Sequence, residues 1–137
     1  AWNIFADYAQ SGELHLKQMA MFALDRLLDT AKTLKTNLPA QGIVTLMKQS
    51  DRLICHLLYA SPVKRGNGIE VIEDIVPIYN VELSYKKKKK KKKKKTDRKI
   101  NKVYLAPQKE DIDFTYDNGY ISVKLAKIEC HQMVVFE

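Results

Sequence analysis

Residues 112–125 read IDFTYDNGYISVKL, and this stretch decides the fold class of the chain. Asn118 and Gly119 are the pair preferred in the two-residue loop of a type I′ turn, in which both central residues have positive φ. Such a loop sets apolar residues of the two arms opposite one another on one face: Ile112 with Leu125, Phe114 with Val123, and Tyr116 with Ile121. The polar residues fall on the other face: Asp113, Thr115, Ser122 and Lys124. Because the turn chemistry and the alternating pattern agree on one register, we predict an antiparallel β-hairpin here.

A second hairpin is predicted upstream, where apolar and β-branched residues fill the segments 43–49 and 52–60. A two-residue loop at Ser50 and Asp51 between them sets two apolar pairs on one face: Val44 with Leu57, and Leu46 with Cys55. Apolar alternation predicts three further strand segments: residues 75–85, 99–108 and 129–137. Two segments rich in Pro and Gly are interpreted as a short extended stretch and a long loop: residues 34–42 and 61–74.

Residues 11–29, SGELHLKQMAMFALDRLLD, carry a helical pattern before the strands begin. Ser11 can cap a helix, and Glu13 suits its positive N-terminal end. Apolar residues then recur at helical spacing: Leu16, Met19, Ala20, Ala23, Leu24 and Leu27. Because further apolar residues widen this stripe beyond one face, the predicted helix of residues 12–28 needs cover on more than one side. We therefore predict a mainly β chain with one N-terminal helix, folded as an antiparallel β-sandwich of about six to eight strands.

Ten consecutive lysines, Lys86 to Lys95, dominate the charge of the chain. The net charge is +8, and removing the ten positive charges of this run leaves −2, so the rest of the chain is faintly acidic. A block of like charges without interleaved aromatic or Arg residues repels itself and stays solvated. We interpret the run as an exposed insertion at the tip of a hairpin that joins the strands at 75–85 and 99–108. We expect no specific nucleic-acid partner, although a polyanion-binding arm is the alternative.

The sequence contains no nucleophile elbow, P-loop, dinucleotide fingerprint or HExxH motif. Cys55 and Cys130 lack the spacing of a zinc site, so we interpret them as small buried residues and leave a disulfide between them open. No signal peptide and no apolar run of membrane-spanning length are found, so no membrane partner is expected. The location stays unknown, with the cytoplasm slightly favoured, because a missing signal says little in a chain that looks cut from a longer one. The chain begins at Ala1 without Met, which suggests that it is cut from a longer polypeptide.

Three carboxylates are grouped at Glu70, Glu73 and Asp74. Paired carboxylates are what a glycosidase uses to cleave its bond. These three, however, lie within five residues of one another in a Gly-flanked segment, so we favour solvated groups or salt bridges with Lys64 or Arg65.

Histidine and aromatic side chains are also candidates for a functional role. The histidines share no ligand spacing and are expected to be packed or hydrogen-bonded: His15, His56 and His131. Four scattered aromatic residues could form a sugar-stacking platform, but core positions are favoured: Trp2, Tyr8, Tyr59 and Tyr79. We therefore predict no catalytic, cofactor-binding or metal-binding residue and no cofactor.

Several segments together resemble a family of large bacterial enzymes. The quoted segments are YAQSGELHLKQMAMFALDRLL, KTNLPAQGIVTLMKQ, HLLYASPVKRGNGIEVIEDIVPIYNVELS, KVYLAPQ and CHQMVVFE. They are similar to the C-terminal end of glycoside hydrolases related to family-42 β-galactosidases, whose relatives include α-L-fucosidase-like proteins. The similarity covers almost the whole chain, is weakest at the lysine run, and includes no catalytic signature.

The resemblance implies a parent with a catalytic (β/α)₈ barrel, a flavodoxin-like trimerisation domain and a small C-terminal β-sandwich. Residues 1–29 would then be the last helical element of the trimerisation domain, and residues 33–137 the sandwich, with the lysine hairpin insertion at 86–95. The family's catalytic glutamates belong to the barrel, so none is carried over to this chain. The implied partners are the barrel and the trimerisation domain, and a homo-oligomer is a further expectation.

The predicted function is thus that of a non-catalytic accessory domain with a structural or assembly role, in a β-galactosidase-like or α-L-fucosidase-like parent. Two alternatives stay open. A carbohydrate-binding β-sandwich module would be indicated by exposed aromatic residues in a row. A polyanion binder acting through residues 86–95 would be indicated by a salt-dependent affinity.

Overall fold

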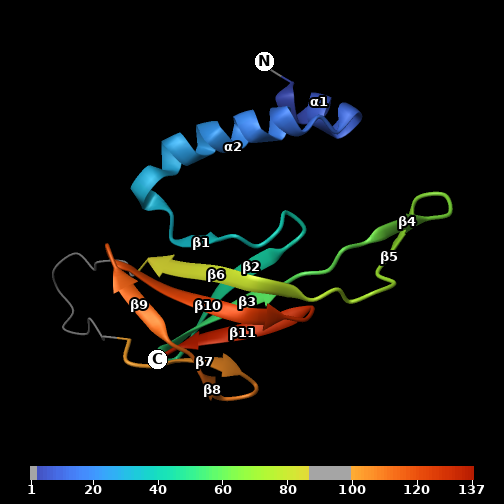
Figure 1. Cartoon of the computed structure of the whole chain (residues 1–137). Coiled ribbons are helices and arrows are strands. Elements are labelled where there is room, and N and C mark those ends of the chain that lie inside the picture. The colour runs from blue at the N-terminus through green and yellow to red at the C-terminus, as the bar shows by residue number, and fades with distance from the viewer. Residues whose placement is uncertain (1–2, 87–99) are drawn as a thin grey trace. The chain divides into compact units, whose positions relative to one another are not determined.

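The computed structural model describes residues 3–86 and 100–137. The chain divides into two compact units, Ala1–Lys32 and Thr33–Glu137. The first unit is helical and the second consists of strands (Figure 1). The assignment of residues 1–29 to an upstream trimerisation domain and of residues 33–137 to a C-terminal sandwich stays a prediction.

The helical unit contains two α-helices where one was predicted: α1 (Ile4–Ser11) and α2 (Leu14–Leu28), followed by a 3₁₀ turn over Asp29–Ala31. Gly12 separates the helices with a left-handed φ of 69°, and its N–H donates to the carbonyl of Tyr8. Glycine adopts this conformation without steric cost, which explains why α1 ends here.

The predicted cap at Ser11 is wrong, because Ser11 is the last residue of α1 and the residue that precedes α2 is Glu13. The Ser11 hydroxyl donates to the carbonyl of Asp7 at 2.8 Å and accepts the N–H of Glu13 at 3.2 Å. It therefore stabilises the turn between the two helices.

The strand unit is built from antiparallel sheets, which confirms the mainly β class. One sheet has four strands in the order β1 (Leu34–Thr36), β6 (Ile78–Lys86), β10 (Tyr120–Ile128) and β9 (Phe114–Asp117). The other has five, in the order β2 (Ile43–Gln49), β3 (Arg52–Leu58), β11 (His131–Phe136), β7 (Val103–Ala106) and β8 (Glu110–Asp111). A two-stranded sheet pairs β4 (Val63–Arg65) with β5 (Ile69–Val71).

Eleven strands are present in the described residues, more than the six to eight predicted. The additional strands are two or three residues long. Three of them, β1, β4 and β5, lie in the segments that Pro and Gly marked as irregular, and β8 lies between two predicted strands. The segment 61–74 was predicted as a long loop, but it folds as the β4–β5 hairpin. Gly66 and Gly68 have φ of 57° and 77° in its turn, which is the geometry that favours glycine.

Both predicted hairpins are confirmed. Asn118 and Gly119 have positive φ of 48° and 81°, and Tyr116 and Phe114 pair with Ile121 and Val123. The β2–β3 hairpin turns at Ser50 and Asp51, with Val44 opposite Leu57 and Leu46 opposite Cys55. The predicted pairing of Ile112 with Leu125 is wrong, because β9 begins at Phe114 and the N–H of Ile112 donates to the carbonyl of Val103.

The lysine run falls largely on residues 87–99, which lie outside the described residues. The strands on either side of it, β6 and β7, belong to different sheets. They do not pair with each other, so the predicted hairpin between them is wrong.

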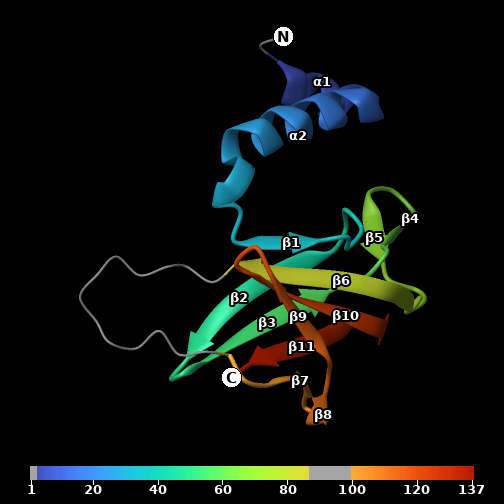
Figure 2. The same ribbon diagram turned by 60° about the vertical axis from the view of Figure 1, so that its left-hand side comes forward.

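The core of the strand unit is one cluster of buried side chains from both large sheets. The four-stranded sheet contributes Val81 and Leu83, and the five-stranded sheet contributes Cys55 and Leu57. The Tyr85 and Phe136 rings meet within this cluster with centroids 5.8 Å apart. Figure 2 shows the long strands of the two sheets from a second direction.

Candidate interaction surfaces

The five-stranded sheet has an apolar side opposite the core. Side chains alternate along each strand, so the register that buries Val44, Leu46 and Cys55 turns their neighbours outward. We call this surface the outer sheet face, and define it by eight residues: Ile43, Thr45, Met47, Ile54, His56, Leu58, His131 and Met133. Ile43 and Met47 are each 57% exposed, and Leu58 is 40% exposed. An exposed apolar area of this kind is typical of an interaction surface.

Two of the predicted histidines meet on the outer sheet face. His56 Nδ1 and His131 Nε2 are 3.1 Å apart, and the rings are stacked with centroids 5.3 Å apart and planes 11° from parallel. One ring donates and the other accepts, so this hydrogen bond needs at least one neutral imidazole. The expectation that these residues are hydrogen-bonded is confirmed, although their contact with each other was not predicted.

A second apolar surface lies on the β4–β5 hairpin and the segment that follows it. This hairpin extends away from the two large sheets in Figure 1. Large apolar side chains along it are exposed: Val63, Ile69, Ile72, Ile75 and Val76. We call residues 63–76 the arm.

The three predicted carboxylates lie on the arm and are exposed. Glu73 accepts hydrogen bonds from Arg65 Nε at 2.7 Å and Arg65 Nη2 at 2.6 Å, which raises the pKa of the Arg65 guanidinium. This bidentate ion pair links the last residue of β4 to the segment that follows β5. The salt-bridge interpretation of Glu73 is thus confirmed, while Glu70 lies opposite Lys64 in the β4–β5 register.

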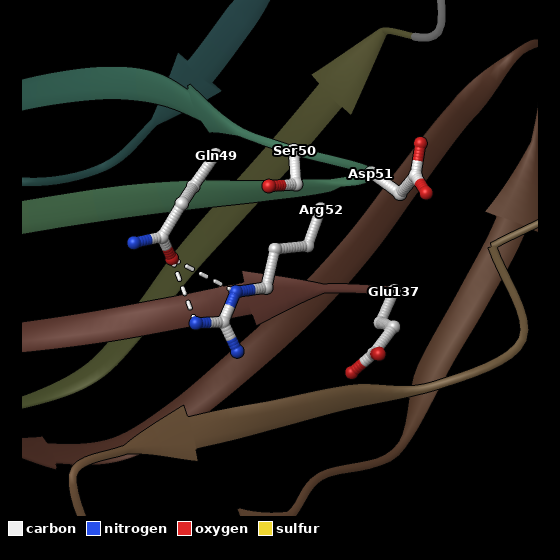
Figure 3. A pocket seen from close by; sticks show the side chains of 5 residues that line it. All are labelled: Gln49, Ser50, Asp51, Arg52 and Glu137. Atoms are coloured by element: carbon white, nitrogen blue, oxygen red, sulfur yellow. Dashed lines mark hydrogen bonds between the residues drawn. The ribbon is translucent and has the colours of Figure 1, made fainter.

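A shallow hollow of about 390 Å³ lies at the β2–β3 turn, lined by Gln49, Ser50, Asp51, Arg52 and Glu137 (Figure 3). Arg52 donates from Nε and Nη2 to the Gln49 amide oxygen, at 2.9 Å and 2.7 Å, and from Nη1 to the Tyr104 hydroxyl at 3.1 Å. The guanidinium is therefore held by neutral oxygens of the protein itself. These hydrogen bonds hold the guanidinium beside the β2–β3 turn.

The remaining predicted residues are dispersed. His15 lies in α2 beside Glu13, Tyr8 belongs to α1, and Trp2 is outside the described residues. The exposed Tyr79 pairs with Lys127 near one end of β10, whereas the exposed Tyr116 pairs with Ile121 near the other end. Six residues of strand separate these ends by about 20 Å. These two exposed tyrosines therefore do not stand together in a row.

The cysteines are free thiols, which answers the question of a disulfide. Cys55 is buried in the core, as predicted, and burial raises its pKa to about 12. Cys130 is partly exposed in the turn between β10 and β11. Within residues 3–86 and 100–137, no group of three or more His, Cys, Asp or Glu side chains is placed to hold a metal ion, and neither helix is long and apolar enough to cross a membrane.

The outer sheet face was not predicted, although the sequence contains a signal for it. Residues 43–47 read IVTLM, so the side chains on both faces of the predicted strand are apolar, apart from Thr45. A strand with two apolar faces is typical of cover on both sides.

Comparisons with known proteins find similarity to parts of two solved structures. A scan of known protein families and a search of curated proteins find no match. Among solved structures, the chain is similar to α-L-fucosidase isoenzyme 2 from Paenibacillus thiaminolyticus, with 48% identity and a TM-score of 0.87 over 100% of its length. It spans 20% of that fucosidase chain. It also shares its fold, at 14% identity and a TM-score of 0.50 over 75% of its length, with a cycloisomaltooligosaccharide glucanotransferase from Paenibacillus sp..

Proposed function

We propose that this chain is an accessory, non-catalytic region of a glycoside hydrolase with a structural and assembly role. The observation that carries the proposal is its 48% identity, over its whole length, to one fifth of an α-L-fucosidase chain. The apolar surfaces of the outer sheet face and the arm support a role in packing against other protein surfaces. An α-L-fucosidase-like parent is favoured over a β-galactosidase-like one, because an α-L-fucosidase is 48% identical to the chain over its whole length.

The finer parts of this proposal concern architecture and partners. We describe the two large sheets as a β-sandwich, which is supported by their common core cluster. We propose that the chain packs against a catalytic barrel and a trimerisation domain of its parent and contributes to a homo-oligomer. Helix α2 supports this, because none of its described side chains is buried although many are apolar.

A chimera tests the proposal. The fifth of the P. thiaminolyticus α-L-fucosidase that matches should be replaced by this chain, and its activity and oligomeric state compared with those of the same enzyme lacking that fifth. We expect the chimera to assemble and to cleave its fucoside, and the shortened enzyme to aggregate or to lose its assembly. A shortened enzyme that assembles and turns over normally would contradict the structural role.

The isolated chain is also expected to lack glycosidase activity. Glycoside cleavage uses two carboxyl groups held about 5–10 Å apart on opposite sides of the bond. Of the three grouped carboxylates on the arm, Glu73 already forms an ion pair with Arg65. The assay uses aryl α-L-fucosides and aryl β-galactosides with repurified protein. Turnover that disappears in Glu70→Gln or Glu73→Gln would show that the chain is itself an enzyme.

A carbohydrate-binding module remains the second candidate, although the separation of Tyr79 and Tyr116 does not favour it. A polyanion-binding role for the lysine run concerns residues outside the described ones. Measuring affinity for a polyanion at two salt concentrations, with and without residues 86–95, tests it.

A further inference from the structure

The stacked histidines sit on a rigid part of the outer sheet face. His56 lies on β3, which pairs with β2 on one side and β11 on the other, and His131 begins β11. The register sets His56 opposite Met133 and His131 opposite Leu58, so the two histidines are diagonal neighbours on the same face. Because the backbone of both residues is held in the sheet, their imidazoles are brought together without a loop having to close.

The distance between the facing nitrogens suits a chelated metal ion. A late transition metal binds imidazole nitrogen at about 2.0–2.1 Å, so two such nitrogens at a bond angle between about 90° and 109° are about 2.8–3.4 Å apart. His56 Nδ1 and His131 Nε2 are 3.1 Å apart, within this range. Both rings would bind as neutral imidazoles with their protons on the other ring nitrogen. Binding therefore needs a change of tautomer in the ring that now donates, and a rotation of the two rings that turns both lone pairs from each other toward the metal.

We infer that His56 and His131 form a two-histidine chelating site for a late divalent transition metal ion. Imidazole nitrogen favours Cu²⁺, Ni²⁺ and Zn²⁺, whereas Mg²⁺ and Ca²⁺ need oxygen ligands. None of the eight residues of the outer sheet face is a carboxylate, and Thr45 and Met133 stand directly opposite His56 on its two sides. The remaining coordination positions would be filled by water or by a donor from a protein that covers this face.

The first experiment measures metal binding by calorimetric titration of the untagged full chain with Ni²⁺ and with Zn²⁺. The titration is done in a Cys130→Ser background, because this partly exposed thiol is the neighbour of His131 and is itself a metal ligand. We expect one saturable site per chain for each ion and none for Mg²⁺. The inference would be overturned if neither Ni²⁺ nor Zn²⁺ binds saturably. It would also be overturned if the wild-type chain binds them and Cys130→Ser alone removes this binding.

Three variants assign the ligands. His56→Gln and His131→Asn should each weaken Ni²⁺ binding by about tenfold or more, because loss of one arm removes the chelate effect. His15→Gln is the matched control, since His15 lies in α2 and should leave the affinity unchanged. His131 is exposed, so its replacement should preserve the fold, and circular dichroism checks this. Equal Ni²⁺ affinity in His131→Asn and in the control would contradict the proposal, even if His56→Gln fails to fold.

Discussion

Asn118 and Gly119 adopt left-handed φ of 48° and 81° in the loop that joins β9 to β10. A Cβ added at Gly119 would meet no atom within 4 Å, so space is not what restricts this position. The restriction is the backbone conformation itself, which L-residues adopt at a cost of about 1–2 kcal/mol and β-branched residues resist most.

Gly119→Val should therefore lower the free energy of unfolding by about 1–2 kcal/mol or more. Lys124→Thr should change it by less than about 0.5 kcal/mol, because Lys124 is exposed and threonine suits a strand. Urea unfolding of both variants measures the difference. Equal losses of stability would mean that the turn conformation does not control this hairpin.

Cys55 makes the stability of the strand unit depend on pH in alkaline solution. Burial raises the pKa of its thiol from 9.0 to about 12. Between these values the unfolded chain loses a proton that the folded chain keeps, so stability should fall as pH rises above about 9, by up to about 1.4 kcal/mol per pH unit.

Cys55→Ala should be less stable at pH 7, because it leaves a cavity, but its stability should fall less steeply between pH 8.5 and pH 10.5. Burial also raises the pKa of Tyr85, but Tyr85 is present in both proteins and contributes equally. Chemical unfolding across this pH range gives the two slopes. Parallel slopes would mean that the thiol ionises in the folded protein.

Helix α2 exposes several large apolar side chains. Phe22 is 65% exposed and Leu27 is 81% exposed, and Leu14, Met19 and Met21 are exposed as well. Each large apolar side chain left in water forgoes about 1.5–3 kcal/mol of burial. Such a helix needs a partner surface.

Deletion of residues 1–32 should therefore give a strand unit that is more soluble than the full chain. Light scattering of both proteins over a range of concentrations measures association. A full chain that stays monomeric, together with a truncated chain that precipitates, would show that the helices belong to the fold of the strand unit.

The elements that could be predicted are those whose signals are local. Both confirmed hairpins have their turn residues and alternating arms within about 20 residues of sequence, so pattern and pairing coincide. The break at Gly12 was missed because the same Ser-Gly pair fits the start of one helix and the end of another. Strands β6 and β7 join different sheets, and their neighbours there include strands distant in the sequence. The local residues do not specify these neighbours.

The histidine pair could not be predicted for the same reason. His56 and His131 are 75 positions apart in sequence, and each alone has the pattern of an ordinary strand residue. Only the pairing of β3 with β11 brings them together. By contrast, Arg65 and Glu73 are eight positions apart across one hairpin, so their ion pair could be predicted from the sequence.

At the scale of the whole strand unit, stability depends on the side chains that join the two large sheets. Phe136 is 1% exposed and its ring contacts Tyr85 of the other sheet. Phe136→Ala should lower the free energy of unfolding by about 3–5 kcal/mol, through lost burial and the cavity that remains.

Tyr116→Ala is the matched control, because this ring is 66% exposed, and it should cost less than about 1 kcal/mol. Thermal or urea unfolding compares the two variants. If the two losses are similar, the shared core is not what holds the sheets together.

The strand order of the five-stranded sheet also governs how it can form on the ribosome. β11 lies between β3 and β7, yet it is the last of the five strands to be synthesised. Until it leaves the exit tunnel, β3 and β7 each present an unpaired edge, and the apolar side chains that β11 will cover are open to water. Vectorial synthesis thus leaves this sheet incomplete until β11 emerges, and a nascent chain stalled before His131 would be a substrate for chaperones.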